Sequence, residues 1–154
     1  MLKAVRKSKA RAGEDSFAIV ASRYNVRYVD SMLNAAVDQL KAAGAKEIKI
    51  LRVPGAFEIP AVAAKLLKGD YSFAAVICLG VIIRGQTGHA QQIGDAVSAS
   101  LAQLQVQHAV PVIHEVLLLE NEEQANVRCL GDRHNRGAEA ARAALEMAEV
   151  MRGL

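Results

Sequence analysis

The sequence has no tryptophan, and its 154 residues include only three phenylalanines and three tyrosines. So few aromatic rings offer little surface on which nucleic-acid bases could stack, and we expect no nucleic-acid partner. Long apolar runs are also missing, because none approaches the roughly 20 residues of a membrane helix. The first residues contain no apolar stretch of the kind found in secretory signals. We therefore expect a cytoplasmic protein with no membrane partner.

Cysteine is scarce, with only Cys78 and Cys129 in the sequence. Cys78 lies within an apolar run and Cys129 within a helical pattern, so we expect both to be small buried residues in a reducing compartment. Their separation fits no common spacing of metal ligands. The sequence therefore predicts no metal site and no disulfide.

The formal charge of +3 is concentrated at the N-terminus. Residues 1–16 contain five basic and two acidic residues, whereas the remainder contains 14 of each. We interpret residues 1–16 as a basic N-terminal arm, most simply a solvated tail, and residues 17–154 as one α/β domain. Apolar residues make up 52% of the sequence, which is typical of a folded chain rather than a disordered one.

Apolar runs of strand length alternate with helical patterns along the chain. The predicted strands are residues 17–22, 47–53, 73–83 and 110–119. Helical periods of three and four residues mark 29–40, 59–67, 93–104, 121–130 and 137–152. This alternation predicts parallel strands joined by right-handed crossovers, with helices on both faces. We predict a single-domain, three-layer αβα sandwich with a flavodoxin-like parallel sheet of strand order 2-1-3-4.

Polar and aromatic side chains gather where these strands end. In such sheets ligands bind at the carboxyl ends of the strands, beside the point where the strand order reverses. The relevant residues are Tyr24 and Asn25, Phe57 and Glu58, and the stretch 84–89, while His114 and Glu115 interrupt the fourth strand. Each has a plainer interpretation: Phe57 as a core residue, Glu58 as a first-turn acid, and His114 as a satisfied core histidine. Their convergence from separate strands favours a small-molecule site.

The segment after the third strand, Arg-Gly-Gln-Thr-Gly-His at 84–89, has the features of an anion site. Glycines let the backbone approach a ligand closely, and a helix is predicted to begin directly afterwards. Backbone N–H groups at a helix start favour a phosphate, and Thr87 adds a hydroxyl donor. Neither GxxxxGK[ST] nor GxGxxG occurs in the sequence. His89 could exchange protons with a ligand bound there near neutral pH.

Six motifs together resemble the lumazine synthases (6,7-dimethyl-8-ribityllumazine synthases) of riboflavin biosynthesis, over residues 17–150. They are VASRYN, VPGAFEIP, LGVIIRGQTGH, PVIHEVLLLEN, EQANVR and NRGAEAARAALEMA, in the order and spacing of that family. The resemblance implies a cofactor-free condensation of 5-amino-6-(D-ribitylamino)uracil with 3,4-dihydroxy-2-butanone 4-phosphate. The products would be 6,7-dimethyl-8-ribityllumazine, inorganic phosphate and water. The alternative is a non-catalytic homologue that binds a flavin or lumazine, which would need neither His89 nor a complete phosphate cradle.

The resemblance also implies a role for each motif residue. His89 would move protons as the catalytic residue. The ribitylaminouracil would contact Tyr24, Asn25, Ala56, Phe57, Glu58, Val81, Ile82, Ile83, His114 and Arg136. The butanone phosphate would be held by Gly85, Gln86, Thr87 and Arg128.

Three departures from the family pattern occur in this chain. Residues 90–92 are Ala-Gln-Gln where many members carry an aromatic residue and an acid, His114 stands where phenylalanine is frequent, and Arg136 stands where lysine is common. The family assembles as homo-pentamers, in some members as shells of 60 subunits, with sites between adjacent subunits. Its N-terminal arm can extend a neighbour's sheet, and riboflavin synthase is an expected partner.

Overall fold

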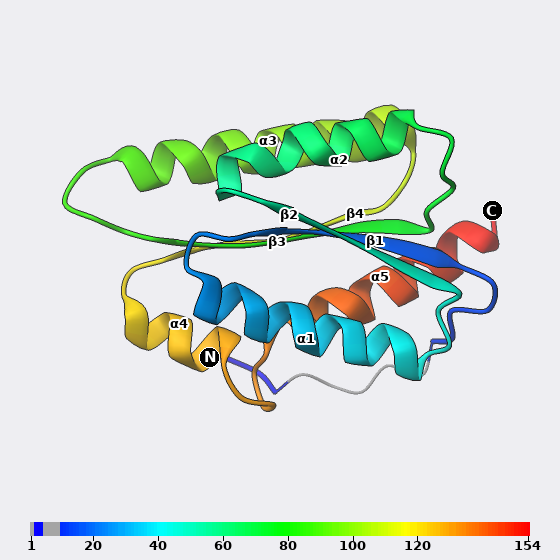
Figure 1. The fold of residues 1–154 in the computed structure, drawn as a ribbon, viewed down its shortest axis with the longest axis horizontal. Coiled ribbons are helices and arrows are strands. Elements are labelled where there is room, and N and C mark those ends of the chain that lie inside the picture. The colour runs from blue at the N-terminus through cyan, green and yellow to red at the C-terminus, as the bar shows by residue number, and fades with distance from the viewer. Residues whose placement is uncertain (1, 5–9) are drawn as a thin grey trace.

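The computed structural model of the chain describes residues 2–4 and 10–154 (Figure 1). The described residues form a four-stranded parallel sheet with the order β2-β1-β3-β4. Its strands are β1 (Ser16–Ser22), β2 (Glu47–Val53), β3 (Ala75–Ile83) and β4 (Val112–Leu119). The predicted strand order is confirmed, and β2 and β4 are the two edges of the sheet.

Helices cover both faces of this sheet. The helices are α1 (Val26–Ala42), α2 (Ile59–Lys68), α3 (His89–His108), α4 (Glu122–Cys129) and α5 (Arg136–Arg152), with a short 3₁₀ helix η1 (Ala56–Glu58) before α2. Figure 1 shows α2 and α3 on one face and α1, α4 and α5 on the other. The predicted three-layer sandwich is therefore confirmed.

Each face of the sheet buries its own hydrophobic core. On one side Ile19, Ile77 and Leu79 pack with residues of α1 and α5, and on the other Val20, Val76 and Cys78 pack with residues of α2 and α3. Successive side chains of a strand point to opposite faces, so strands buried on both faces consist of continuous apolar residues.

Both cysteines are free and buried, as predicted. Burial raises the pKa of the Cys78 thiol to about 12. The pKa of Cys129 is likewise raised to about 12, chiefly by burial and then by the nearby carboxyl of Glu115. A thiol with so high a pKa carries almost no reactive thiolate near neutral pH. The structure therefore assigns both residues to packing.

Side-chain caps fix the starts of the last two helices. The Asn121 side chain accepts a bond from the Gln124 backbone N–H at 2.9 Å, as the capping pattern predicts. The Gln124 side chain accepts in turn from the backbone of Glu120 at 2.9 Å, one residue before the cap itself. Asn135, which is buried, accepts from the backbone N–H of Gly137 at 2.8 Å. This cap starts α5 at Arg136, one residue before the predicted start.

The chain just before β1 packs against the domain instead of forming a solvated tail. Ala12 is fully buried, and its backbone N–H donates to the carbonyl of Ala43 at 3.0 Å. Asp15 forms an ion pair with Arg152 near the end of α5. The solvated-tail interpretation is therefore wrong for residues 10–15, whereas the basic residues Arg6, Lys7 and Lys9 lie outside the described residues.

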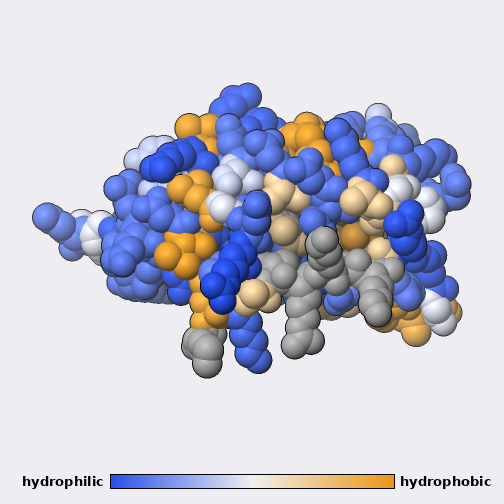
Figure 2. All heavy atoms as spheres, turned by 90° about the horizontal axis from the view of Figure 1, so that it is seen from below, coloured by the Kyte–Doolittle hydropathy of each residue, from blue (hydrophilic) through white to orange (hydrophobic). Residues whose placement is uncertain are grey.

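Figure 2 shows the molecule from the side of α1, α4 and α5, where apolar residues form small groups among polar ones. The large apolar residues that these helices leave exposed are Val26, Val127, Met147 and Val150. Isolated exposed apolar side chains are ordinary on a protein surface and by themselves indicate no partner.

Within residues 2–4 and 10–154, no helix is both long enough and apolar enough to cross a membrane.

Candidate active site

A cleft of about 830 Å³ opens at the carboxyl ends of β1 and β3, where the strand order reverses. Its walls come from the ends of these strands, from η1 and from the first two turns of α3. The volume lies within the usual range of small-molecule sites. Of the residues predicted to bind or transform a ligand, those that line the cleft are Tyr24, Asn25, Ala56, Phe57, Glu58, Val81, Ile82, Ile83, Gly85, Thr87 and His89.

Two aromatic rings border the cleft with most of their surface uncovered. Tyr24 is 74% exposed and Phe57 is 62% exposed. The interpretation of Phe57 as a core residue is therefore wrong, because its ring belongs to the rim of the cleft and not to either core. Exposed aromatic faces of this kind can stack on a flat heterocyclic ring.

Asn25 joins the start of α1 to the end of β3. It adopts the left-handed conformation (φ 59°), which asparagine tolerates better than most residues. Its side-chain amide donates to the carbonyl of Val81 at 2.7 Å. The Val81 carbonyl therefore already accepts one hydrogen bond from the protein. Its second lone pair can still accept a hydrogen bond from the ribitylaminouracil that Val81 is expected to contact.

The turn after β3 leads directly into α3. Gly88 precedes the helix, and the backbone N–H of His89 donates to the Thr87 hydroxyl oxygen at 3.4 Å. The hydroxyl proton of Thr87 is thereby left to donate elsewhere, because its oxygen already serves as the acceptor. The first N–H groups of a helix have no partner within the helix and carry its positive dipole end. This end of the cleft can therefore bind an anion beside the imidazole of His89.

The remaining predicted site residues do not line the cleft of their own chain. Gln86 lies on the exposed turn, and His114, Arg128 and Arg136 belong to β4, α4 and α5. These three residues come from the edge strand and the two elements that follow it. One chain therefore brings together a first set of motifs, those that follow β1, β2 and β3. It leaves apart a second set, which contains His114, Arg128 and Arg136.

His114 is exposed, so its interpretation as a core histidine is wrong. Its Nδ1 accepts from the backbone N–H of Val116 at 3.3 Å, and its Nε2 lies 2.7 Å from the Ser98 hydroxyl. An accepting Nδ1 places the proton of the neutral ring on Nε2, which then donates to Ser98. The pair consequently does not form an activated serine, for which the histidine would have to accept the hydroxyl proton.

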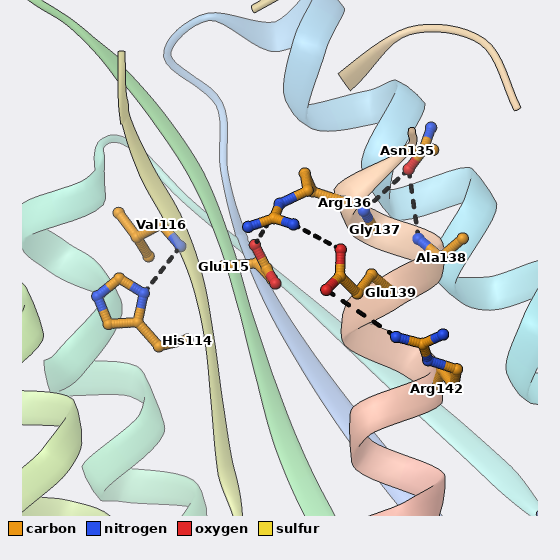
Figure 3. A network of polar contacts seen from close by, with 9 residues as sticks. All are labelled: His114, Glu115, Val116, Asn135, Arg136, Gly137, Ala138, Glu139 and Arg142. Atoms are coloured by element: carbon orange, nitrogen blue, oxygen red, sulfur yellow. Dashed lines mark hydrogen bonds and ion pairs between the residues drawn. The ribbon is translucent and has the colours of Figure 1, made fainter. Parts of the chain in front are cut away.

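Figure 3 shows Arg136, the first residue of α5, between the carboxylates of Glu115 and Glu139. Its Nη1 donates to Glu139 at 2.6 Å, whereas its Nε lies 3.8 Å from Glu115 on β4. The Glu115 side chain is only 13% exposed. Burial raises the pKa of Glu115 to about 7, an effect that the Arg136 charge opposes and the Glu139 charge reinforces. A carboxyl group that is partly protonated at neutral pH thus lies beside a residue expected to bind substrate.

Replacing Glu115 with glutamine should stabilise the protein at high pH and leave it unchanged at low pH. A carboxyl whose pKa is raised from 4.5 to about 7 on folding favours the folded state most when it is protonated. That stability is lost as the pH rises from about 4.5, where the unfolded chain ionises, to about 7, where the buried group becomes charged as well. At pH 8 we expect Glu115→Gln to exceed the wild type by up to about 3 kcal/mol in urea denaturation.

The matched control is Glu146→Gln on α5, whose carboxyl is 60% exposed. Its stability relative to the wild type should not change between pH 5 and pH 8. A pH-independent difference for Glu115→Gln would contradict the raised pKa.

Sequence reasoning missed the contribution of α3 to the cleft. Ala90, Ile93 and Ala96 line it, together with Gln92 from the same two turns. Ile93 and Ala96 lie in the helical pattern predicted over residues 93–104, and a helical period cannot separate a face that packs on a sheet from one that borders a cleft. Small alanines near the carboxyl end of a parallel sheet are the signal that could have indicated room for a ligand.

Comparison with known proteins gives one family. The family model described as 6,7-dimethyl-8-ribityllumazine synthase matches residues 14–152. Proteins of that name are 41% identical over 140 residues in Stenotrophomonas maltophilia (90% of each chain) and 42% identical over 139 residues in Kineococcus radiotolerans (89% of this chain and 85% of the relative). The protein of that name from Desulfotalea psychrophila is 40% identical over 146 residues, 94% of each chain. The matched region includes every residue that lines the cleft.

Proposed function

Because the chain belongs to the 6,7-dimethyl-8-ribityllumazine synthase family, we propose that it condenses 5-amino-6-(D-ribitylamino)uracil with 3,4-dihydroxy-2-butanone 4-phosphate. The product is 6,7-dimethyl-8-ribityllumazine, and the reaction is the penultimate step of riboflavin biosynthesis. The observation that carries this proposal is the cleft itself, in which exposed aromatic rings, an anion-binding helix start and a histidine meet. Buried free thiols support a reducing, cytoplasmic location.

The proposed reaction needs positioning and proton transfer, without a redox step. The amino group of the uracil attacks the ketone and water leaves, which gives a Schiff base. A proton is then lost from carbon and the phosphate group leaves. The ribityl-bearing nitrogen closes the ring, and this closure releases the second water of the reaction. Holding two reactive substrates together in the right orientation can supply much of the rate.

We propose that the two substrates bind in different parts of the cleft. We propose that a planar pyrimidine stacks on Tyr24 and Phe57, and that Glu58, which lines the same cleft, meets polar ring or ribityl groups. The turn with Thr87 and the start of α3 suits the phosphate of the butanone. His89 lines the same cleft directly after this turn, as the first residue of α3, and we propose that it accepts the carbon-bound proton and protonates a leaving group.

The second set of motifs, His114, Arg128 and Arg136, supports a site shared between neighbouring subunits. We propose a homo-pentamer, with closure into a 60-subunit shell as the larger form, in which β4, α4 and α5 of one subunit complete the cleft of the next. A ring joins unlike surfaces, so every subunit would give one half-site and receive another. The part of the N-terminal arm that precedes residue 10 would extend a neighbour's sheet, and riboflavin synthase, which consumes the product, is the proposed partner enzyme.

The test is to follow lumazine absorbance after mixing the protein with both substrates in the presence of EDTA. We expect product only when both substrates are present, together with one inorganic phosphate for each lumazine. Binding of added lumazine without its formation would instead support the non-catalytic homologue. Activity that required added Mg²⁺ or Zn²⁺ would contradict a metal-free mechanism.

A further inference from the structure

Arg84 directly follows β3 and precedes the anion-binding turn, yet its side chain does not line the cleft. Its Nε donates to the Glu120 carboxylate at 2.7 Å, and its Nη2 donates to the side-chain oxygen of Gln91. The Arg84 backbone N–H also donates to the carbonyl of Leu119 at 2.8 Å. The cation at the end of this buried strand is therefore occupied by protein acceptors.

These contacts join three elements around the turn. Gln91 belongs to the first turn of α3, and its amide donates to Asp95, one turn further along, at 2.7 Å. Glu120 follows the last residue of β4, and its backbone N–H is held by Gln124 of α4. Because residues 84 and 91 lie on either side of the turn, their contact closes the turn across its base.

The space beside the two glycines of the turn is open. A Cβ atom added at Gly85 or at Gly88 would meet nothing within 4 Å among the described residues. Glycines also have more backbone freedom than other residues. At these two positions no neighbouring side chain, in the part of the chain that the structure describes, limits the backbone, so we expect contacts at the two ends of the turn to matter for its position.

We propose that Arg84 is a positioning residue, which clamps the turn at 85–88 and the start of α3 in the geometry that receives the phosphate of the substrate. The proposal rests on the function proposed above. Arginine suits the task because its planar fork presents donors to two acceptors at once, which a lysine ammonium cannot do with the same geometry. The side chains of Arg84 and Glu120 are 35% and 61% exposed, so their ion pair adds little to overall stability. Displacing a substrate by about 1 Å, however, can slow a reaction roughly 100-fold.

The test compares Arg84→Met with Arg152→Met. Arg152 is a matched control, because it is also partly exposed, pairs with a carboxylate and donates to a backbone carbonyl, but it lies at the end of α5 and outside the cleft lining. We expect both variants to melt at similar temperatures. For Arg84→Met alone, kcat/KM for the butanone phosphate should fall about 10- to 100-fold. The KM for the ribitylaminouracil should change less than about twofold, because the pyrimidine end of the cleft does not depend on the turn.

Two further variants separate positioning from simple destabilisation. Gln91→Leu removes one contact of the clamp and keeps the cation, whereas Arg84→Lys keeps the pair with Glu120. In both variants kcat/KM for the butanone phosphate should fall less than in Arg84→Met. Equal kinetics for Arg84→Met and Arg152→Met would overturn the clamp. A rise in the KM for ribitylaminouracil as large as that for the butanone phosphate would overturn it too, because a positioned turn affects binding of the phosphate substrate alone.

Titration with inorganic phosphate distinguishes failure of the clamp from failure of the proposed function. We expect calorimetry to show weaker phosphate binding by Arg84→Met than by the wild type or Arg152→Met. If the wild type forms no lumazine but phosphate binding falls in this way, the proposed function fails and the clamp stands. If the wild type forms lumazine and the three proteins bind phosphate equally, the clamp alone fails.

Discussion

Gly137→Ala should destabilise the protein by about 3 kcal/mol or more, and we expect little folded protein to remain in mild denaturant. Gly137 is the second residue of α5, it is buried, and it packs directly on the backbone of α1. A Cβ atom built on it would lie 2.5 Å from the Cα of Met32 and closer still to the Met32 carbonyl group. Backbone atoms within a helix cannot rotate aside as a side chain can, so α1 and α5 would have to separate.

The control is Gly153→Ala at the other end of the same helix. There an added Cβ would lie 3.4 Å from the nearest atom, the carbonyl oxygen of Val150, and the glycine has a right-handed backbone that alanine also adopts. Urea denaturation of this variant should differ little from the wild type. If Gly137→Ala were as stable as Gly153→Ala, the close approach of α1 and α5 would be wrong.

His89→Ala should lower kcat by about 10- to 10⁴-fold, the range expected when acid–base catalysis is lost. We expect a value toward the lower end, because bringing two reactive substrates together is itself catalytic. The imidazole lies on the first residue of α3, exposed at the cleft and next to the anion-binding turn. Steady-state kinetics with both substrates saturating measure this effect directly.

His108→Ala is the matched variant, because His108 is the last residue of the same helix and lies outside the cleft lining. It should keep the wild-type kcat. Unchanged turnover in His89→Ala would remove this residue from the mechanism, and an equal fall in both variants would point to damage to α3 instead.

The strands could be predicted from the sequence because their burial is continuous. β2 has the predicted limits, and β1 starts one residue early at Ser16. β3 starts at Ala75 instead of residue 73, since Phe73 stacks on Tyr71 before the strand pairing begins. Helix α3 starts at His89, before its first periodic apolar residue at 93, because its first turn faces the cleft and carries no apolar stripe.

The site could be predicted only as far as topology brings residues together. Parallel strands end on the same side of the sheet, so the strand-end motifs at Tyr24, Phe57 and His89 had to meet once the order 2-1-3-4 was assumed. The sequence could not show that Arg84 turns away from the cleft, because a cation beside a glycine turn is equally suited to binding an anion. Nor could it place Arg128, since an edge strand and its following helix can serve either their own chain or a neighbour.

The division of one site between two subunits is tested most directly by mixing two impaired variants, His89→Ala and Arg128→Ala. Each is unfolded and refolded alone, and both are then refolded together in equal amounts, with ring assembly checked by sedimentation. In a shared site, random mixing pairs an intact His89 half with an intact Arg128 half in about a quarter of the sites. The mixture should therefore recover about a quarter of the wild-type lumazine synthesis. Assembled mixtures no more active than the average of the two variants measured alone would contradict a shared site, because no pairing could then create an intact one.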